Sequence, residues 1–311
     1  KPGVDPAHIK HVTVFAGKET RKAVQEGRAD CISMHFSDMP INMRNGITPV
    51  TVSILHLAPP DKFGYCSMGI NCDYERAALE TAKLVIAEIN PNMPRTFGDN
   101  LVHVSEIDYF VMSDRPIWTM AKPTIGETEK KIGAFIADMV EDGMTLQIGM
   151  GGIPNAIMEA LGDKNDLGLH SELLSDGSME LIKAGVMTGK KKTLHPGKAV
   201  CTFASGTTEL YEWLDYNPMV EFYPVDYINN SHVNSLNDNL LSVNSAISVD
   251  LMGQVCAETI NAKQYSGIGG QMDFVRGATW SKGGKAIIAM PATTKHGTIS
   301  KIVCNFQPGD A

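Results

Sequence analysis

Residues 146–157 read LQIGMGGIPNAI, and this stretch decides the fold class. An apolar run leads into a glycine-rich turn, and Pro154 presets the backbone φ angle for the start of a helix. A strand that enters a helix through glycines presents backbone N–H groups at the helix N-terminus, where they stabilise a phosphate or an oxyanion. A tight connection without a ligand is the alternative, because the spacing matches neither a Walker loop nor GxGxxG.

The alternation of strand and helix extends along the whole chain, which is typical of an α/β protein. One helix is expected over TEKKIGAFIADMVEDG, with Thr128 as its cap. Another is expected over DYERAALETAK. In the first helix five apolar residues recur at helical spacing and are expected in the core, namely Ile132, Phe135, Ile136, Met139 and Val140. The expected strands are HVTVFAG, TPVTVSILHL, KLVIAEI, MTLQIGM, KAVCTFA and KAIIAM.

A chain of 311 residues has room for two domains of ordinary size. The region 113–127 contains two prolines and has no sustained period, so we place a boundary there and expect domains at 1–120 and 121–311. A weak internal repeat supports two similar halves. TVFA at residues 13–16 resembles CTFA at 201–204, and VSILHLAPPDKFGYCS resembles AISVDLMGQVCAE about 188 residues later. A cleft between similar halves is a common ligand site.

Composition excludes several classes of protein. The formal net charge of -8 argues against a nucleic-acid-binding protein, which requires a basic face. No apolar run reaches the roughly 18 residues of a membrane-spanning helix, and KPGVDPAHIK has no signal-peptide pattern. The 6 cysteines are scattered and the 9 histidines show no HxxxH or HExxH spacing, so neither a disulfide framework nor a metal site is expected. We expect a cytoplasmic protein without a membrane partner.

Two further segments carry candidate chemistry. In LGLHSELLSDG, residues 167–177, a short strand delivers Glu172 where the chain turns, and ligands gather at such strand ends. A carboxylate there is a base, a metal ligand or a nucleophile, and the alternative is a solvated surface turn. In SGIGGQMDFVRG, residues 266–277, clustered glycines indicate a positive φ or a close approach, and their N–H groups could cradle an anion. The adjacent MDFV is expected to be a strand, which puts the glycines at the edge of an element, and a β-bulge or hairpin turn without a ligand is the alternative.

Taken together, IGMGGIPNAI, LHSELLSDG and SGIGGQMDFVRG resemble the class I CoA transferases, in the branch of acetyl-CoA hydrolases and 4-hydroxybutyrate CoA-transferases. VNSAISVDLMGQVCAE lies between the last two, and HLAPPDKFGYCSMG and INPNMPRTFGDN in the first half are similar to this branch. Many class I members have Glu-x-Gly-x-x-Gly after the nucleophile, whereas Leu173 and Leu174 follow Glu172 here and suit the 4-hydroxybutyrate branch. Chains of the family usually extend further at both ends.

The resemblance implies two similar open α/β domains with the active site in the cleft between them. It implies that Glu172 carries CoA covalently, and that the side chain of Asn229 and the backbone N–H of Gly270 form an oxyanion hole. Asn230 competes with Asn229 for this role, and Asn229 could equally be a turn residue. By the same resemblance, CoA is a substrate, no cofactor is bound permanently, and the chain forms a homodimer or larger oligomer. Residues implied in binding CoA are Gly149, Met150, Gly151, Gly152, Gly267, Gly269, Gln271 and Lys295.

Three functions remain open at this point. The first is transfer of CoA between an acyl-CoA (acetyl, butyryl or 4-hydroxybutyryl) and a small carboxylate such as acetate or 4-hydroxybutyrate. The second is hydrolysis of acyl-CoA at the same site, with water in place of the second acid. The third is a non-catalytic module that senses a sugar phosphate through its glycine loops. The preferred acid is left open, because nothing in the first half of the chain is diagnostic of it.

Overall fold

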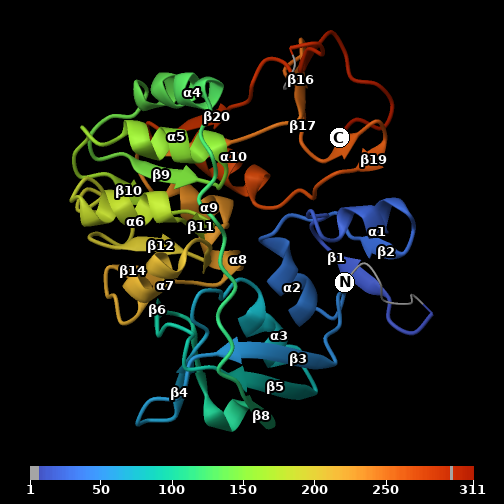
Figure 1. The fold of residues 1–311 in the computed structure, drawn as a ribbon, viewed down its shortest axis with the longest axis vertical. Coiled ribbons are helices and arrows are strands. Elements are labelled where there is room, and N and C mark those ends of the chain that lie inside the picture. The colour runs from blue at the N-terminus through green and yellow to red at the C-terminus, as the bar shows by residue number, and fades with distance from the viewer. Residues whose placement is uncertain (1–6, 295–296) are drawn as a thin grey trace. The chain divides into compact units, whose positions relative to one another are not determined.

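The computed structural model describes residues 7–294 and 297–311, which form two compact units (Figure 1). Unit 1 comprises Lys1–Phe36, Asn244–Met272 and Ile287–Ala311, and unit 2 comprises Ser37–Val243 and Asp273–Ala286. Among the described residues, no helix has the length and apolar character needed to cross a bilayer. The domain boundary expected after residue 120 stays a prediction.

Unit 1 is built from short elements. Its strands β1 and β2 pair in parallel, β16 pairs antiparallel with β17 and parallel with β21, and β18 pairs antiparallel with β19. The bounds are β1 His11–Thr13, α1 Arg21–Gln25, β2 Ala29–Cys31, β16 Ser248–Asp250, β17 Val255–Cys256, β18 Thr259–Ile260, β19 Lys263–Gln264 and β21 Ile302–Val303.

Unit 2 contains parallel sheets in the orders β10-β9-β15-β20, β12-β14-β6 and β3-β5-β8, and the smaller pairs β11-β13 and β4-β7. Three elements, β15, α10 and β20, continue across the division into unit 1. The strands are β3 Val52–Leu57, β4 Tyr65–Ser67, β5 Leu84–Ile89, β6 Phe97–Gly98, β7 Leu101–His103, β8 Tyr109–Met112, β9 Thr145–Ile148, β10 Gly168–Leu169, β11 Leu173–Leu174, β12 Ala199–Cys201, β13 Phe203–Ala204, β14 Val220–Phe222, β15 Leu240–Asn244 and β20 Lys285–Ile288. The helices are α2 Asp38–Arg44, α3 Glu75–Thr81, η1 Val104–Glu106, α4 Glu127–Ala137, α5 Gly152–Ala160, α6 Asp176–Lys183, α7 Thr208–Leu214, α8 Val225–Ile228, α9 Ser231–Ser235 and α10 Gln271–Trp280.

The six expected strands all form, and the expected helices are α3 and α4. Two details of α4 were wrong. The helix begins at Glu127 with Gly126 as its N-cap, so Thr128 lies inside it. Phe135 and Met139 are 68% and 48% exposed instead of buried in the core. The reason is that α4 buries a narrower stripe through Gly133, where a Cβ would overlap the backbone of Ala156 in α5.

The expected repeat forms the same turn in both copies. Asp61 accepts hydrogen bonds from the N–H groups two and four residues further on, and Asp250 does the same. Gly64 and Gly253 follow these aspartates at φ 86° and 84°, a conformation that favours glycine. The agreement extends to the next loop, where GINCDYERAA starts at Gly69 (φ 67°) and GGQMDFVRGA starts at Gly269 (φ 58°). Each loop places an aspartate four residues after its glycine and leads into a helix.

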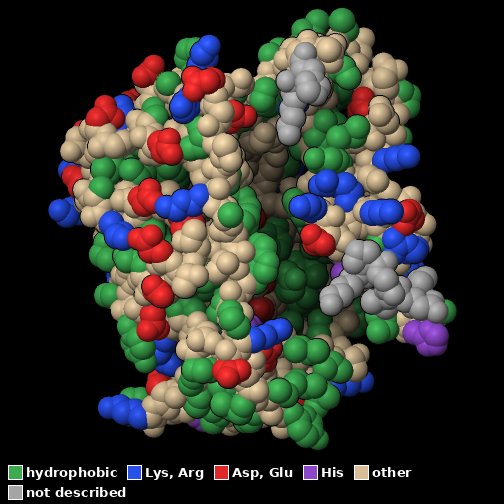
Figure 2. All heavy atoms as spheres, in the orientation of Figure 1, with side chains coloured by type: hydrophobic (Ala, Val, Ile, Leu, Met, Phe, Trp, Pro, Cys, Tyr) green, Lys and Arg blue, Asp and Glu red, His purple; other side chains and the backbone are tan. Residues whose placement is uncertain are grey.

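The sheet β3-β5-β8 carries several exposed apolar side chains. Tyr109, Phe110 and Met112 of the edge strand β8 and Ile54 of β3 are all exposed. Figure 2 shows hydrophobic side chains gathered at the lower end of the view, where Figure 1 places β5 and β8. From this sheet the crossing segment (residues 113–126), which has no regular structure, runs to α4 as the green trace of Figure 1.

Gly98 lies in the sheet of unit 2 where β6, from the first half of the sequence, pairs with β14, from the second half. It is the last residue of β6, which pairs in parallel with β14, and its φ is 117°. A Cβ at this position would overlap the backbone of Phe222. We expect Gly98→Ala to lower the free energy of unfolding by about 2 kcal/mol or more, since a strained backbone and a lost strand pairing add together.

Urea unfolding of Gly98→Ala beside Gly162→Ala measures this cost. Gly162 is a matched control, because no heavy atom lies within 4 Å of its ideal Cβ position. Equal unfolding midpoints for the two variants would contradict the packing argument.

Candidate functional site

The glycine loop after β9 has the expected strand–turn–helix form. β9 ends at Ile148, and α5 begins at Gly152 with Gly151 as its N-cap. Gly151 has φ 127°, which only glycine adopts readily. Gly149 and Met150 complete the turn, and Met150 also lines a small cavity. A helix of nine residues therefore begins at this turn, and its contact with CoA stays a prediction.

Glu172 lies at a bend between two short strands, β10 and β11. Its backbone oxygen accepts hydrogen bonds from the N–H groups of Thr202 (3.0 Å) and Phe203 (3.1 Å). The hydroxyl of Ser171 donates to the backbone oxygen of Ile148 at 3.1 Å, which connects the bend to the end of β9. The main chain around Glu172 is therefore fixed on both sides, while its side chain is only partly buried. The alternative of a solvated surface turn does not describe this position.

Asn229 is the residue that contacts the Glu172 carboxylate. Its Nδ2 donates to Oε2 of Glu172 at 2.8 Å, and the Asn229 side chain is completely buried at the C-cap of α8. Its Oδ1 has no hydrogen-bond partner among the described residues. The competitor Asn230 instead caps α9, where its side chain accepts from the N–H groups of His232 and Val233. Geometry thus separates two adjacent asparagines that the sequence left open.

His170 connects the Glu172 bend to the helix that carries Asn229. Its Nε2 lies 3.0 Å from the backbone oxygen of Ile228, and its Nδ1 lies 3.2 Å from Nδ2 of Asn237. His170 is completely buried, and this burial lowers its pKa to about 3. A neutral ring fits both contacts, with Nε2–H donating to the carbonyl and Nδ1 accepting from the amide. The sequence did not predict this link.

Two buried aspartates act on the charge of Glu172. Burial raises the pKa of Glu172 to about 7, the hydrogen bond from Asn229 lowers it, and the charges of Asp273 and Asp73 raise it further. Asp273 lies in the first turn of α10 and accepts from the hydroxyl and the N–H of Ser37. Burial also raises the pKa of Asp73, to about 6. Sequence reasoning missed both aspartates, although the shared Gly-x-x-x-Asp spacing of their loops could have revealed them.

The remaining candidates lie in unit 1 or outside the described residues. Gly267 passes so close to Val14 that a Cβ would overlap the Val14 backbone oxygen. Gly269 bridges to His35, and its backbone oxygen accepts from the N–H of Phe36 at 3.0 Å. Gly270 is buried before Gln271, the first residue of α10. Lys295 lies outside the described residues. The roles predicted for these residues stay predictions.

One expectation for the third segment was wrong: MDFV is helical, within α10, and is not a strand. A short apolar run does not distinguish strand from buried helix by itself. Here Phe274 and Ala278, one turn apart, are buried together. Gly277 lies between them, and a Cβ there would overlap the side chain of Asn234. Close packing of the helix therefore outweighs the local β propensity.

Comparison with known proteins places this geometry in a family. The model of the acetyl-CoA hydrolase/transferase N-terminal domain matches residues 3–120, and that of the C-terminal domain matches residues 206–311. A 4-hydroxybutyrate coenzyme A transferase of Clostridium kluyveri is 52% identical over 304 residues, which are 98% of this chain and 71% of the relative. The chain belongs to the acetyl-CoA hydrolase/transferase family.

Other members agree with this assignment. A succinyl-CoA:cyclohexane-1-carboxylate CoA transferase of Geobacter metallireducens is 44% identical, with 97% of this chain and 69% of the relative covered. The crystal structure of a 4-hydroxybutyrate CoA-transferase from Porphyromonas gingivalis matches with a TM-score of 0.83 at 40% identity, over 97% of this chain and 75% of that one. RipA from Yersinia pestis matches with a TM-score of 0.90 at 37% identity, over 97% and 70%. The expected two-domain α/β fold of the CoA transferases is confirmed.

The raised pKa of Glu172 makes folding depend on pH. The folded chain holds this proton up to about pH 7, whereas a free glutamate releases it near 4.5. Stability should therefore fall as the pH rises from about 4.5 to about 7, by about 3 kcal/mol. Glu172→Gln keeps an oxygen for Asn229 and carries no charge. We expect it to be more stable than the wild type by about 2–4 kcal/mol at pH 8, and equal to it at pH 4.5.

Denaturant unfolding at the two pH values measures this difference. Glu159→Gln is the control, since Glu159 is exposed on α5 and its replacement should change stability equally at both. A Glu172→Gln variant whose stability follows the wild type at both pH values would show that burial does not disfavour the charge of Glu172.

Proposed function

We propose that this chain is a CoA transferase that exchanges CoA between an acyl-CoA and a small carboxylic acid, with Glu172 as the covalent carrier. The observation that carries the proposal is the Asn229–Glu172 hydrogen bond, a buried amide donor at 2.8 Å from a partly buried carboxylate. Relatives that are 38–52% identical are named CoA transferases, whereas an acetyl-CoA hydrolase of Candida glabrata is 24% identical. These names favour transfer over hydrolysis and over a non-catalytic sensing module.

The reaction balances as four attacks. The Glu172 carboxylate attacks the acyl-CoA carbonyl, which gives an acyl-glutamyl anhydride and CoA thiolate. The thiolate attacks the glutamyl carbonyl, forms a glutamyl-CoA thioester and releases the first acid. The second acid then attacks this thioester, and the thiolate returns to the new acyl carbonyl, which yields the new acyl-CoA and free Glu172. Because thiolate is a good leaving group, no strong general base is needed.

Each attack places negative charge on a carbonyl oxygen, which requires a nearby donor. Asn229 contacts the Glu172 carboxylate, which supports its Nδ2 as the proposed donor when the glutamyl carbonyl is attacked. We propose Gly270 as the backbone donor of the same hole, as the family resemblance implies. The glycine loop Gly149–Gly152, the residues Gly267, Gly269 and Gln271, and Lys295 are proposed to bind CoA. Water exclusion protects both glutamyl intermediates.

Finer expectations accompany this proposal. We propose acetate, butyrate and 4-hydroxybutyrate as the acids, since relatives of this chain are named for these substrates. We further propose a cytoplasmic homodimer, with CoA bound only as a substrate and with a domain boundary after residue 120.

Trapping of the intermediate tests the proposed function. Borohydride added with acetyl-CoA should reduce the glutamyl-CoA thioester, and mass spectrometry of peptides should place the modification on Glu172. The Glu172→Gln variant should remain unmodified and should transfer no CoA, because an amide does not form the anhydride. A modification at another residue, or none, would contradict the mechanism. CoA release at full rate without added acid would instead assign hydrolysis.

Loss of the Asn229 amide should affect the chemical step and not binding. We expect Asn229→Ala to lower kcat about 10²–10³-fold with little change in KM for acyl-CoA. The acid limb of the pH profile should also move above its wild-type value near 7, since this hydrogen bond lowers the pKa of Glu172. Steady-state kinetics from pH 5.5 to 9 measure both effects. Asn230→Ser keeps the α9 cap and is the adjacent control; an equal loss in that variant would assign the effect to helix packing.

A further inference from the structure

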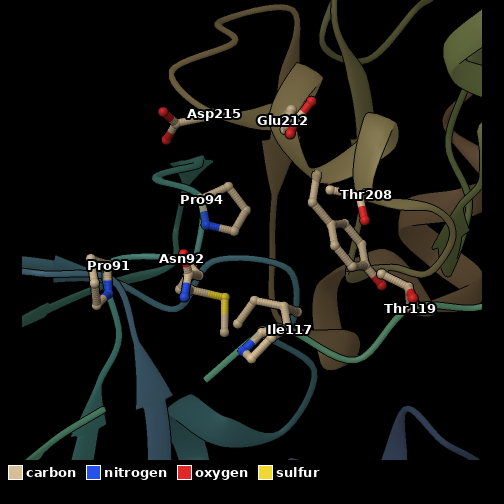
Figure 3. A pocket seen from close by; sticks show the side chains of 11 residues that line it. Pro91, Asn92, Pro94, Ile117, Thr119, Thr208, Glu212 and Asp215 are labelled. Carbon is tan, nitrogen blue, oxygen red and sulfur yellow. The ribbon is translucent and has the colours of Figure 1, made fainter. Parts of the chain in front are cut away.

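A cavity of about 340 Å³ lies in unit 2 next to the segment that flanks Glu172. Its polar lining consists of His56, Asn71, Glu75 and Arg115, and the rest is apolar, including residues 116–118 of the crossing segment. Figure 3 shows the neighbouring cavity, which shares Met93, Pro116 and Ile117 with it and has Glu212 and Asp215 on its far side. The volume suits a small acid and is too small for a whole CoA thioester.

All four polar residues in this cavity have a hydrogen-bond partner, but one oxygen of Glu75 has none. Arg115 donates to Glu88 at 2.6 Å, and Nε2 of His56 lies 3.0 Å from Nδ2 of Asn90. Nδ2 of Asn71 donates to Oε1 of Glu75 at 3.2 Å. Oε2 of Glu75 is buried and has no partner among the described residues. Glu75 therefore brings one unused hydrogen-bonding oxygen to the cavity.

An unpartnered buried oxygen is costly unless a ligand satisfies it. Burial raises the pKa of Glu75 well above its ordinary value, and the charge of Asp73 raises it further. These causes favour the protonated form of Glu75, which has one O–H donor and free acceptor positions. This combination is complementary to a hydroxyl group, which also donates once and accepts. It is a poor partner for a methyl group, which leaves it unsatisfied.

The cavity lies within reach of Glu172. Asn71 forms an antiparallel bridge to Phe203, and the N–H of Cys72 donates to the backbone oxygen of Thr202 at 2.9 Å. Thr202 and Phe203 in turn donate their N–H groups to the Glu172 backbone oxygen. Two strand spacings, about 10 Å, therefore separate the main chain of Glu172 from that of Asn71. The Glu172 side chain and a four-carbon acyl chain together span this distance.

We propose that this cavity receives the carbon chain of the carboxylic acid, and that Glu75 selects acids bearing a hydroxyl group by hydrogen-bonding to it. The inference rests on the proposed function, because the acid reaches the cavity from an acyl group attached to Glu172. The apolar lining holds the methylene groups, and Glu75 binds the terminal hydroxyl. The substrate class is thus short ω-hydroxy carboxylic acids.

Acceptor specificity tests this assignment. With acetyl-CoA as donor, kcat/KM is measured for 4-hydroxybutyrate and for butyrate. Glu75→Met has similar volume and no hydrogen-bonding group, and it should lower the ratio of hydroxy acid to butyrate at least about 10-fold. Any transfer to butyrate that the variant retains also shows that it is folded. Glu75→Gln still donates and accepts, and should keep the wild-type ratio within a few-fold.

Glu212→Gln is the matched control, since Glu212 lines the neighbouring cavity of Figure 3 and is exposed. It should leave the ratio unchanged, and a changed ratio in this variant alone would place the acyl chain in that cavity instead. An unchanged ratio in Glu75→Met, or equal losses with both acids, would overturn the assignment. If Glu75→Met does not fold, Glu75→Ala replaces it, because alanine requires no extra room. The same ratio of kcat/KM for 4-hydroxybutyrate to that for butyrate is then measured, and the same decrease is expected. Failure of the proposed function looks different, because the wild type would then transfer CoA to neither acid.

Discussion

The site depends on one set of buried hydrogen bonds in unit 2. The His170 ring reaches the backbone oxygen of Ile228, and the next residue, Asn229, reaches back to Glu172. His170 and Glu172 on one segment contact Ile228 and Asn229 on the other, so the four residues form a closed loop. This loop fixes the amide of Asn229 and the carboxylate of Glu172 relative to each other. Because His170 is completely buried and neutral, its two contacts in this loop involve no charge that salt or solvent would weaken. Preorganisation of this kind is what a donor to an oxyanion requires.

Electrostatics sets the other constraint on Glu172. A carboxylate that is stabilised too strongly is a poor nucleophile, and one that is too strongly destabilised stays protonated. Here burial and the charges of Asp73 and Asp273 raise the pKa of Glu172, while Asn229 lowers it. A pKa near 7 leaves part of Glu172 ionised at neutral pH, and burial of that charge lowers the stability of the fold. Stability lost at a functional group is a common feature of active sites.

Much of the site followed from the sequence, because its parts are local. The glycine turn at residues 149–152 and the bend at Glu172 could be predicted because they contain or adjoin residues with strong backbone preferences. The predictions that were wrong failed because of tertiary packing. MDFV forms a helix because Gly277 leaves room for the side chain of Asn234. Phe135 is exposed because α4 packs against α5 through the face that carries Gly133. The aspartates and Glu75 were missed because their pKa values are set by burial, which one sequence does not reveal.

The internal repeat gives the chain two variants of one loop, to which two different roles are proposed. The loops that start at Gly69 and Gly269 keep a glycine at positive φ and an aspartate four residues later. They differ at the two positions to which roles are proposed. Ile70 corresponds to Gly270, the proposed backbone donor, and Glu75 corresponds to Val275. The copy with Gly270 has no side chain at this position, which suits the role proposed for its backbone N–H. The copy with Ile70 and Glu75 has side chains to build a cavity, and side chains can distinguish one acid from another. If both proposed roles hold, divergence of two loops from one pattern separates stabilisation of the transition state from selection of the substrate.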